Sequence, residues 1–459
     1  MKKSVLIPIL LFVAVFCETQ FCQPYSLKFE SWQSLFLLTA DWFHEVFSYS
    51  FPVSTLLGSL LEQYYDVQVA GALIVAALVT AIYMCVNVFL RRTGLPFHRL
   101  VSLLAACACW SLTASAETNT AVVAVLLAAG VLALLSLSLR RRLTSPVRGW
   151  EMAAAALIVC IATVSVITNP SARKREAVSR AQVCACTSQW DRLLKAATPE
   201  ACVKDPRLMP FAFLALGEKG TLGDRMFEYP LSGPQDFDMT GDNSAVGSFF
   251  NSILNEQMGS TNEAIHHIFQ YSCHLPHGSS YISLLLLTRF NAEGGHYTMS
   301  RKYAEVLRRN PKSRRAASGL LTRYAGLADV CDSLGHSSAS ARVVTNNPAY
   351  NIGQFNLDGI SSDFLTERFL CYALLEGDIE RFRDAFSTLN WTDRPVPVHY
   401  QEALLLAGVE PSAYSFDERT VRKFSNFISA MQNRDDSTVE STAAGTYWAY
   451  YLKLQNEAQ

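Results

Sequence analysis

Residues 281–311 read YISLLLLTRFNAEGGHYTMSRKYAEVLRRNP, and this stretch decides the fold of the C-terminal part of the chain. An apolar helical segment leads to Gly295, and a second segment with Ala304 and Leu307 on one face follows it and ends before Pro311. Glycine adopts the left-handed backbone that commonly ends a helix. The stretch therefore predicts a hairpin of two antiparallel helices.

The same pattern recurs along the chain at intervals of 39, 36, 40 and 42 residues, which separate Gly220, Gly259, Gly295, Gly335 and Gly377. A single helix pair cannot bury its apolar face, so successive pairs stack into a solenoid. The period and the second-helix pattern resemble those of tetratricopeptide (TPR) repeats, although these repeats are longer and less regular. We expect a TPR-like α-helical solenoid; the alternative is a plain α-helical domain in which glycine simply ends helices.

The composition divides the chain into two parts. Its 459 residues are 50% hydrophobic and 17% charged, which is too apolar for a purely water-soluble protein of this length. Residues 1–169 contain only 10 of the 39 basic and 8 of the 40 acidic residues. We therefore predict an all-α chain with a transmembrane helix bundle in residues 1–169 and a helical-repeat domain in residues 170–459. The net charge of −1 excludes a broadly basic nucleic-acid binder, and no nucleic-acid partner is expected.

Several segments are long and apolar enough to cross a bilayer as a helix, which takes about 17–25 residues. The four clearest are Val67–Leu90, Leu100–Ala116, Thr120–Leu139 and Trp150–Thr168. A shorter run, Val5–Cys17, follows two lysines, so residues 1–22 are either a retained first span or a cleaved signal peptide. The lack of a good small-x-small cleavage site favours the span, which gives about five spans.

Residues 23–66 form a separate segment. The apolar side chains between Phe29 and Phe47 recur at helical spacing, with charged residues between them. This pattern predicts an amphipathic helix that lies in the membrane interface. A sixth span through residues 46–61 is the alternative.

The basic residues of the short loops predict the orientation, because they concentrate on the cytoplasmic side of a membrane. With five spans, one side collects Lys2, Lys3, Arg91, Arg92, Arg99, Arg140, Arg141, Arg142 and Arg148. We therefore expect a multi-pass protein of the bacterial inner membrane, with a cytoplasmic N-terminus and a periplasmic C-terminal domain. Arg173, Lys174, Arg175 and Arg180 argue against this orientation, but long domains translocate largely regardless of charge.

No catalytic, cofactor-binding or metal site is expected from the motifs. The loop Asp236–Asp242 opens like an EF-hand calcium loop, but its twelfth position is Gly247 instead of glutamate, which favours a polar connecting loop. One dense cluster of possible metal ligands comprises His266, His267, Cys273, His274 and His277. Its spacing matches no standard structural zinc pattern, and a solvated helix end is the preferred interpretation.

The cysteines and one glycine-rich stretch are two further candidate features. Cys184 or Cys186 could form a disulfide with Cys202, but buried free thiols are the default expectation, so the redox state stays open. The glycine-rich stretch Gly217–Gly223 lies between helices instead of following a strand, which disfavours a phosphate-binding interpretation.

Five short stretches together resemble a known family: Phe29–Phe36, Leu60–Tyr64, Ala70–Ala72, Met209–Leu216 and Leu222–Tyr229. They are similar to a family of Bacteroidota inner-membrane proteins that has TPR-like C-terminal regions and no established activity. The resemblance implies location and architecture only, and it supplies no catalytic residue.

The functional hypothesis follows from the repeats and from the missing catalytic motifs. We expect a scaffold anchored in the lipid bilayer that binds a protein or peptide partner on its solenoid surface. The alternative is a membrane-bound enzyme or transport subunit that acts on lipid or polysaccharide. Its catalytic groups would be the acids predicted on the outer face, Glu30, Asp41, Glu45, Glu62 and Asp66, which the preferred interpretation places on the polar side of an interfacial helix.

Overall fold

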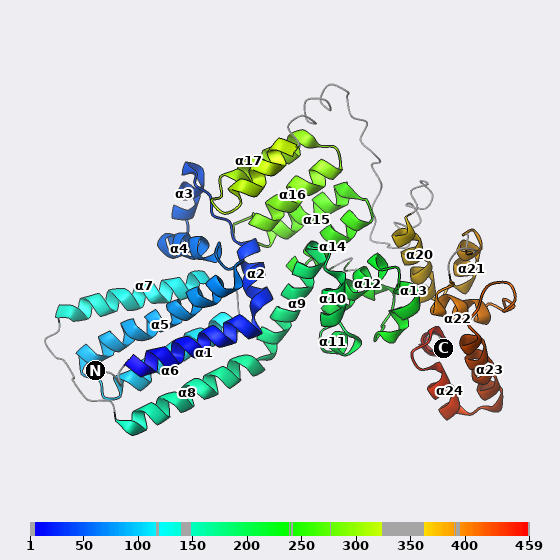
Figure 1. Ribbon diagram of the computed structural model, residues 1–459, viewed down its shortest axis with the longest axis horizontal. Coiled ribbons are helices and arrows are strands. Elements are labelled where there is room, and N and C mark those ends of the chain that lie inside the picture. The colour runs from blue at the N-terminus through cyan, green and yellow to red at the C-terminus, as the bar shows by residue number, and fades with distance from the viewer. Residues whose placement is uncertain are drawn as a thin grey trace. The chain divides into compact units, whose positions relative to one another are not determined.

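The computed structural model describes residues 5–115, 119–138, 148–237, 239, 242–275, 277–323, 362–389, 391 and 395–457. Every regular element in these ranges is helical, which confirms the all-α class. The chain forms two compact units (Figure 1), one of residues 1–183 and 272–336 and the other of residues 184–271 and 337–459. The predicted boundary at residue 169 divides lipid-embedded from water-exposed chain. The two units are defined by packing instead of by solvent, so this boundary stays a prediction.

The first unit contains a bundle of five helices. Its helices are α1 (Leu6–Cys22), α5 (Gln68–Thr93), α6 (His98–Ser115), α7 (Asn119–Leu135) and α8 (Gly149–Thr168). Helix α5 packs against α1, α6 and α7, and α8 packs against α1 and α6 (Figure 1). The buried interior includes Leu11, Val79, Trp110 and Val159, whereas outward-facing side chains such as Ile161 are apolar and exposed.

Three helices of the described residues are long and apolar enough to cross a membrane: Gln68–Thr93, Ala121–Ser138 and Gly149–Thr168. A fourth candidate is the pair of α1 and α2 (Pro24–Gln33), which meet at an angle of 82°. The total of five spans stays a prediction, because α6 is not among these candidates.

Proline begins the helix after two sharp bends of the first unit. Gln23 precedes Pro24 with φ −131° and ψ 36°, outside the helical region, and Pro24 is the first residue of α2. Asn169 likewise precedes Pro170, the first residue of α9 (Pro170–Cys186), and the Asn169 side chain accepts a hydrogen bond from Ser171 N at 2.9 Å. A residue before proline is disfavoured in a helix, and proline tolerates the first helical position, so each bend has a local cause.

The segment 23–66 contains a break within the stretch from Phe29 to Phe47, so the prediction of an amphipathic helix over that stretch is wrong. It contains α2, α3 (Ala40–Phe47) and α4 (Pro52–Glu62), and residues 34–38 are not helical. The reason is a partner far along the chain, because Ser34 O accepts from Tyr281 N at 3.4 Å and Leu38 N donates to Arg309 O at 3.2 Å. A helix would use these backbone groups internally.

The partner of this segment is the hairpin of α16 (Tyr281–Glu293) and α17 (Tyr297–Arg308). Its apolar face forms one cluster with the aromatic stripe that was predicted to face lipid. The buried members of this cluster are Leu35, Phe36, Leu37, Trp42, Val46, Leu284, Leu307 and Ala317. The first unit therefore includes a helix pair that follows α9 by about a hundred residues.

The second unit is built from shorter helices, of which α12 is buried on every face. They are α10 (Trp190–Ala196), α11 (Pro199–Lys204), α12 (Met209–Glu218), α13 (Leu222–Arg225), α14 (Ala245–Gln257), α15 (Thr261–Cys273), α20 (Asp363–Glu376), α21 (Ile379–Ser387), α22 (Val398–Leu406), α23 (Glu418–Asn433), α24 (Asp436–Ala443) and α25 (Tyr447–Glu457). Side chains on every face of α12 are buried, including Phe211, Phe213 and Leu216. A helix that is apolar all round forms the core of its unit.

The glycine turns confirm the helix–turn–helix prediction at four positions. Gly220, Gly259, Gly295 and Gly377 have φ values of 62°, 72°, 78° and 73°, and each joins two helices. Gly335 lies outside the described residues. The chain also turns at Gly445, which has φ 69° and lies between α24 and α25.

Candidate functional site

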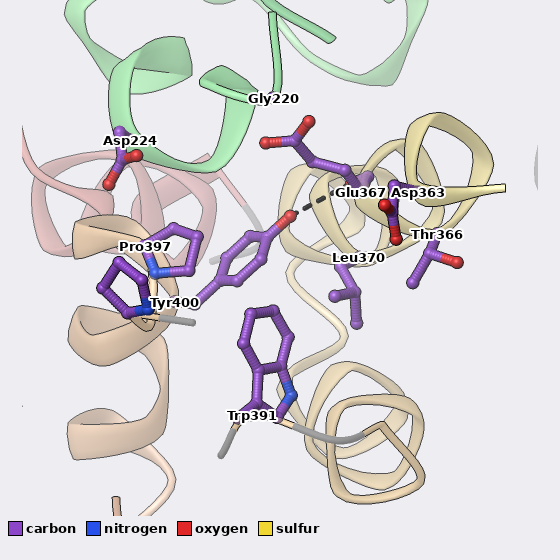
Figure 2. Close-up of a pocket in the computed structure, with 10 residues that line it drawn as sticks. Gly220, Asp224, Asp363, Thr366, Glu367, Leu370, Trp391, Pro397 and Tyr400 are labelled. Atoms are coloured by element: carbon purple, nitrogen blue, oxygen red, sulfur yellow. Dashed lines mark hydrogen bonds between the residues drawn. The ribbon is translucent and has the colours of Figure 1, made fainter. Parts of the chain in front are cut away.

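A cavity of about 260 Å³ lies in the second unit where α13, α20 and α22 meet (Figure 2), and we name it the Tyr400 pocket. Helix α20 contributes Asp363, Thr366, Glu367 and Leu370 to its lining. The other lining residues come from three places. Gly220 lies in the turn before α13 and Asp224 in α13, Trp391, Pro395 and Pro397 precede α22, and Tyr400 lies in α22.

Two aromatic rings form the inner part of this pocket. The Tyr400 side chain is 1% exposed, and its hydroxyl donates to Glu367 O at 3.2 Å (Figure 2). The Trp391 ring lies 6.0 Å from the Tyr400 ring at an interplanar angle of 83°. Trp391 stacks on Phe386 at 4.4 Å and donates from Nε1 to Phe386 O at 3.1 Å, so its orientation is fixed.

Backbone groups at two helix starts tie the acids of the pocket in place. Val398 N, at the start of α22, donates to Asp224 Oδ1 at 2.8 Å, and Gly223 N in α13 donates to Glu367 Oε1 at 3.0 Å. Gly223 has to be glycine for this approach, because a Cβ atom there would lie 2.8 Å from Tyr400 Cζ. The first turn of a helix has unpaired N–H groups, which carboxylates satisfy well.

The charged side chains in the described lining of the pocket are all acidic. Three carboxylates line it, those of Asp224, Asp363 and Glu367, and the lining that the structure describes contains no lysine, arginine or histidine. Burial raises the pKa of Tyr400 well above its usual value and does the same for the pKa of the Cys371 thiol, which lies 3.3 Å from the Tyr400 hydroxyl. Both groups are therefore neutral at pH 7, and neither is an activated nucleophile.

A second polar site lies in the first unit, where α1 bends into α2, and we name it the α1–α2 corner. Glu18 is 4% exposed and accepts from Gln23 Nε2 at 2.7 Å and from Trp110 Nε1 at 3.3 Å. Arg175 of α9 donates from Nη1 to Glu30 at 3.1 Å and from Nη2 to Gln23 Oε1 at 3.1 Å. A buried arginine thus joins the carboxylate of α2 to the amide that binds Glu18.

Glu176, the next residue of α9, caps α2 from outside. Its carboxylate accepts from Tyr25 N at 3.1 Å and from Ser26 N at 2.8 Å, the second and third helical residues. Helix α2 has no side-chain cap of its own, so these N–H groups would otherwise be unpaired. Burial raises the pKa of Glu176, and the hydrogen bonds from Ser26 and Tyr25 oppose that rise.

The outer-face acids predicted for an enzyme have different structural partners. Glu30 pairs with Arg175, Glu45 accepts from the Tyr49 hydroxyl at 2.7 Å, and Asp66 lies 3.4 Å from Lys312 Nζ. Asp41 lies in the first turn of α3, and Glu62 is the last residue of α4. Glu30, Glu45 and Asp66 therefore make packing contacts within the first unit.

The other sequence candidates lie in turns and along α15. Asp236 accepts from Gly233 N at 3.0 Å, Asp242 accepts from Ser244 N at 2.9 Å, and residues 238, 240 and 241 of the proposed calcium loop lie outside the described residues. His267 contacts Gln270, and His277 packs on Tyr49. Within the described ranges, no group of three or more His, Cys, Asp and Glu side chains could hold a metal ion.

The cysteines and the glycine-rich stretch are also placed by the structure. Cys184, Cys186 and Cys202 are free thiols, and burial raises the pKa of Cys202 to about 12. Gly220 forms the left-handed turn between α12 and α13 and lines the Tyr400 pocket beside carboxylates, which would repel a phosphate.

Comparison with protein families gives one result. The model of the Family of unknown function (DUF6057) matches residues 1–168 and 147–454. The chain belongs to this family. The DUF6057 match confirms membership of a family of unknown function, whereas the predicted Bacteroidota origin, membrane location and TPR-like repeats stay predictions. Searches of curated proteins and of solved structures give no match.

Sequence reasoning missed both polar sites. Asp224, Glu367 and Tyr400 are more than thirty residues apart in sequence, and only the packing of α13, α20 and α22 brings them together. For the Tyr400 pocket, the available signal was a pair of prolines, Pro395 and Pro397, that precede an apolar helix and follow Trp391. For the α1–α2 corner, the signal was a glutamate at the end of one apolar run predicted to span the membrane, with a tryptophan in a second such run.

Proposed function

We propose that this chain is a membrane-anchored helical-repeat protein that binds a protein partner and acts as a scaffold in the bacterial cell envelope. In this proposal, about five spans anchor it in the inner membrane, and a TPR-like solenoid presents the binding surface in the periplasm. Repeated helix pairs expose an extended surface on which partner peptides or helices lie.

The observation that carries the proposal is the recurrence of helix, left-handed glycine and helix at Gly220, Gly259, Gly295 and Gly377. This turn brings two helices side by side, and such pairs are the building unit of helical-repeat proteins. The Tyr400 pocket supports the same proposal, because among the described residues burial keeps the Tyr400 hydroxyl and the adjacent Cys371 thiol neutral. Glu30, Glu45 and Asp66 each contact a polar side chain of the first unit. The alternative, an enzyme that uses these acids for catalysis, therefore has less support.

The contacts of α9 remove part of the argument against a periplasmic C-terminal domain. Arg173 donates to Ile167 O at 2.7 Å, Arg175 pairs with Glu30, and the Arg180 guanidinium lies over the Tyr25 ring at 5.2 Å. These cations have structural partners close to the last span, so they need not mark the cytoplasmic side. Positive residues orient a span most strongly when they lie in short, otherwise unpaired loops.

Topology reporters provide the first test. We expect a reporter fused after Arg148 to report the cytoplasm and a reporter fused at Gln459 to report the periplasm, because one span separates the two positions in the proposed arrangement. The measurement compares phosphatase and fluorescent-protein fusions at both positions. The same compartment for both fusions would reject the proposed topology.

In-cell photocrosslinking tests the binding function. A photocrosslinking amino acid replaces Asp384 of α21 or Ser437 of α24, which are both exposed, in the full-length protein. We expect at least one position to give a discrete crosslinked product that contains the same partner protein in repeated experiments, identified by mass spectrometry. A position in α8 such as Ile161, exposed on the apolar face, is the control and should give no such product. The proposal fails if no position captures a protein and the purified protein turns over a lipid or glycan.

A further inference from the structure

We propose that four arginines of the first unit bind the phosphate groups of anionic phospholipids at the membrane surface. They are Arg308, Arg309, Arg314 and Arg315, and we name them the arginine patch. The inference rests on the membrane anchor of the proposed function and is independent of the partner protein. Three observations support it: the charge of the patch, its place in the fold and the apolar side chains beside it.

The segment that carries the patch is strongly basic. Residues 299–323 contain eight lysines and arginines and a single acidic residue, Glu305. Arg301 pairs with Glu305 at 3.3 Å, and Lys312 pairs with Asp66 at 3.4 Å. The four side chains of the arginine patch are exposed, and among the residues that the structure describes none forms an ion pair with them. Their charge is therefore available to an anion from outside the chain.

Contacts of the same segment place the patch beside the start of α5. Asn310 Nδ2 donates to Gln63 Oε1 at 2.8 Å, and Lys312 pairs with Asp66, so residues 310–312 are bound to the chain that directly precedes α5. At 1.5 Å per residue, the 26 residues of α5 span about 39 Å, which exceeds the hydrocarbon thickness of about 30 Å. When α5 crosses the bilayer, its start therefore lies at headgroup depth, and the arginine patch lies there with it.

Exposed apolar side chains near the patch distinguish a lipid surface from other anionic partners. Leu38 is 60% exposed, and its backbone N–H donates to Arg309 O at 3.2 Å. Tyr64 and Val67, on either side of Asp66, are 55% and 59% exposed. At a membrane interface such side chains enter the lipid while nearby cations meet the headgroups. An acidic peptide or a nucleic-acid backbone would pair with the arginines but leave these apolar side chains in water.

Arginine is well suited to binding a lipid phosphate. Its planar guanidinium donates two parallel hydrogen bonds to phosphate oxygens, which a lysine cannot do. Arg308 and Arg309 lie at the end of α17, and Arg314 and Arg315 begin the helical stretch after residues 311–313. Each basic residue near an anionic membrane surface strengthens binding by up to about five-fold, so two pairs of arginines produce a marked preference for anionic lipid.

Native mass spectrometry of the full-length protein in detergent provides the test. The probe is phosphatidylglycerol, and phosphatidylcholine with the same acyl chains is the match without net charge. We expect phosphatidylglycerol to bind about ten-fold more tightly than phosphatidylcholine, and less tightly as the ionic strength rises. The double variants Arg308→Gln/Arg309→Gln and Arg314→Gln/Arg315→Gln should each weaken phosphatidylglycerol binding by about ten-fold.

A pair of arginines in the second unit provides the matched control. Arg419→Gln/Arg422→Gln removes the same charge from two exposed positions of α23 and should leave the affinity unchanged. All three double variants replace exposed side chains and keep backbone contacts such as that of Arg309 O with Leu38 N, so they preserve the fold. Circular dichroism of each variant checks this point before lipid is added.

Several results would overturn the inference. Equal affinity for the two lipids would show that the headgroup charge is not recognised, and equal weakening by the α23 control would show only a general electrostatic effect. If glycerol 1-phosphate displaced phosphatidylglycerol at equal concentration, the occupant would be a free phosphate compound. If a hexaglutamate peptide did so, the occupant would be an acidic protein segment.

The same variants separate this inference from the proposed function. If both arginine-patch variants bound phosphatidylglycerol as the wild type does, while crosslinking at Ser437 still captured the partner, the inference would fail and the proposed function would stand. If the wild-type protein were recovered in the soluble fraction of lysed cells, the membrane anchor would be rejected, and the proposed function and this inference would fail together.

Discussion

Replacing Arg175 with methionine is expected to lower the free energy of unfolding by about 3–5 kcal/mol. The substitution removes the cation that pairs with Glu30 and binds Gln23, and it leaves buried carboxylates without their counter-charge. The Arg175 and Glu30 side chains are only 16% and 12% exposed, so water cannot replace the lost contacts efficiently. Unfolding of the full-length protein in detergent, followed by circular dichroism, measures the change.

The neighbouring residue provides the control for this prediction. Lys174→Met removes the same charge from the same helix at an exposed position and should change stability by about 0.5 kcal/mol or less. Glu30→Gln combined with Arg175→Met should cost less than the sum of the two single substitutions, because the double variant removes both members of the pair. Equal effects of the two cation replacements would contradict the structural role of the α1–α2 corner.

Replacing Phe213 with alanine is expected to destabilise the second unit by about 3–5 kcal/mol. Phe213 is fully buried in α12, and its ring lies 5.5 Å from the Tyr229 ring and 5.8 Å from the Phe237 ring. The alanine variant loses the buried apolar surface of the ring and leaves a cavity that its neighbours fill only in part. Urea unfolding of the full-length protein in detergent, followed by near-ultraviolet circular dichroism, reports this loss.

An exposed phenylalanine provides the control, because its replacement removes an aromatic ring without leaving a buried cavity. Phe269 of α15 belongs to the same unit and is 46% exposed. Phe269→Ala should therefore cost about 1 kcal/mol or less, because nearly half of the residue's surface is already in contact with water in the native state. Comparable losses for the two variants would show that α12 is not the core of this unit.

Local sequence features predicted the elements that depend on near neighbours. The four described glycine turns were predicted because the left-handed backbone is a property of a single residue. The apolar runs of α5 and α8 were predicted for the same reason, since hydrophobicity over about twenty positions is a local property. The turn at Gly445 was missed, although the same residue type ends α24.

The segment after Pro24 shows where local reasoning failed. The apolar spacing from Phe29 to Phe47 has the period of a helix, yet residues 34–38 leave helical conformation to bind the ends of the α16–α17 hairpin. Periodicity indicates which side chains need burial but does not identify the surface that buries them. Here that surface is contributed by residues more than two hundred positions away.

The sequence by itself determined the all-α class, the apolar helices, the glycine-ended hairpins and membership of the DUF6057 family. Only the tertiary structure decided that Arg175 meets Glu30 and that Trp391, Glu367 and Tyr400 share a pocket. The physical reason is the range of the interactions. Helix formation and turning depend on residues a few positions apart, whereas the charge and shape of a site depend on which distant helices pack together.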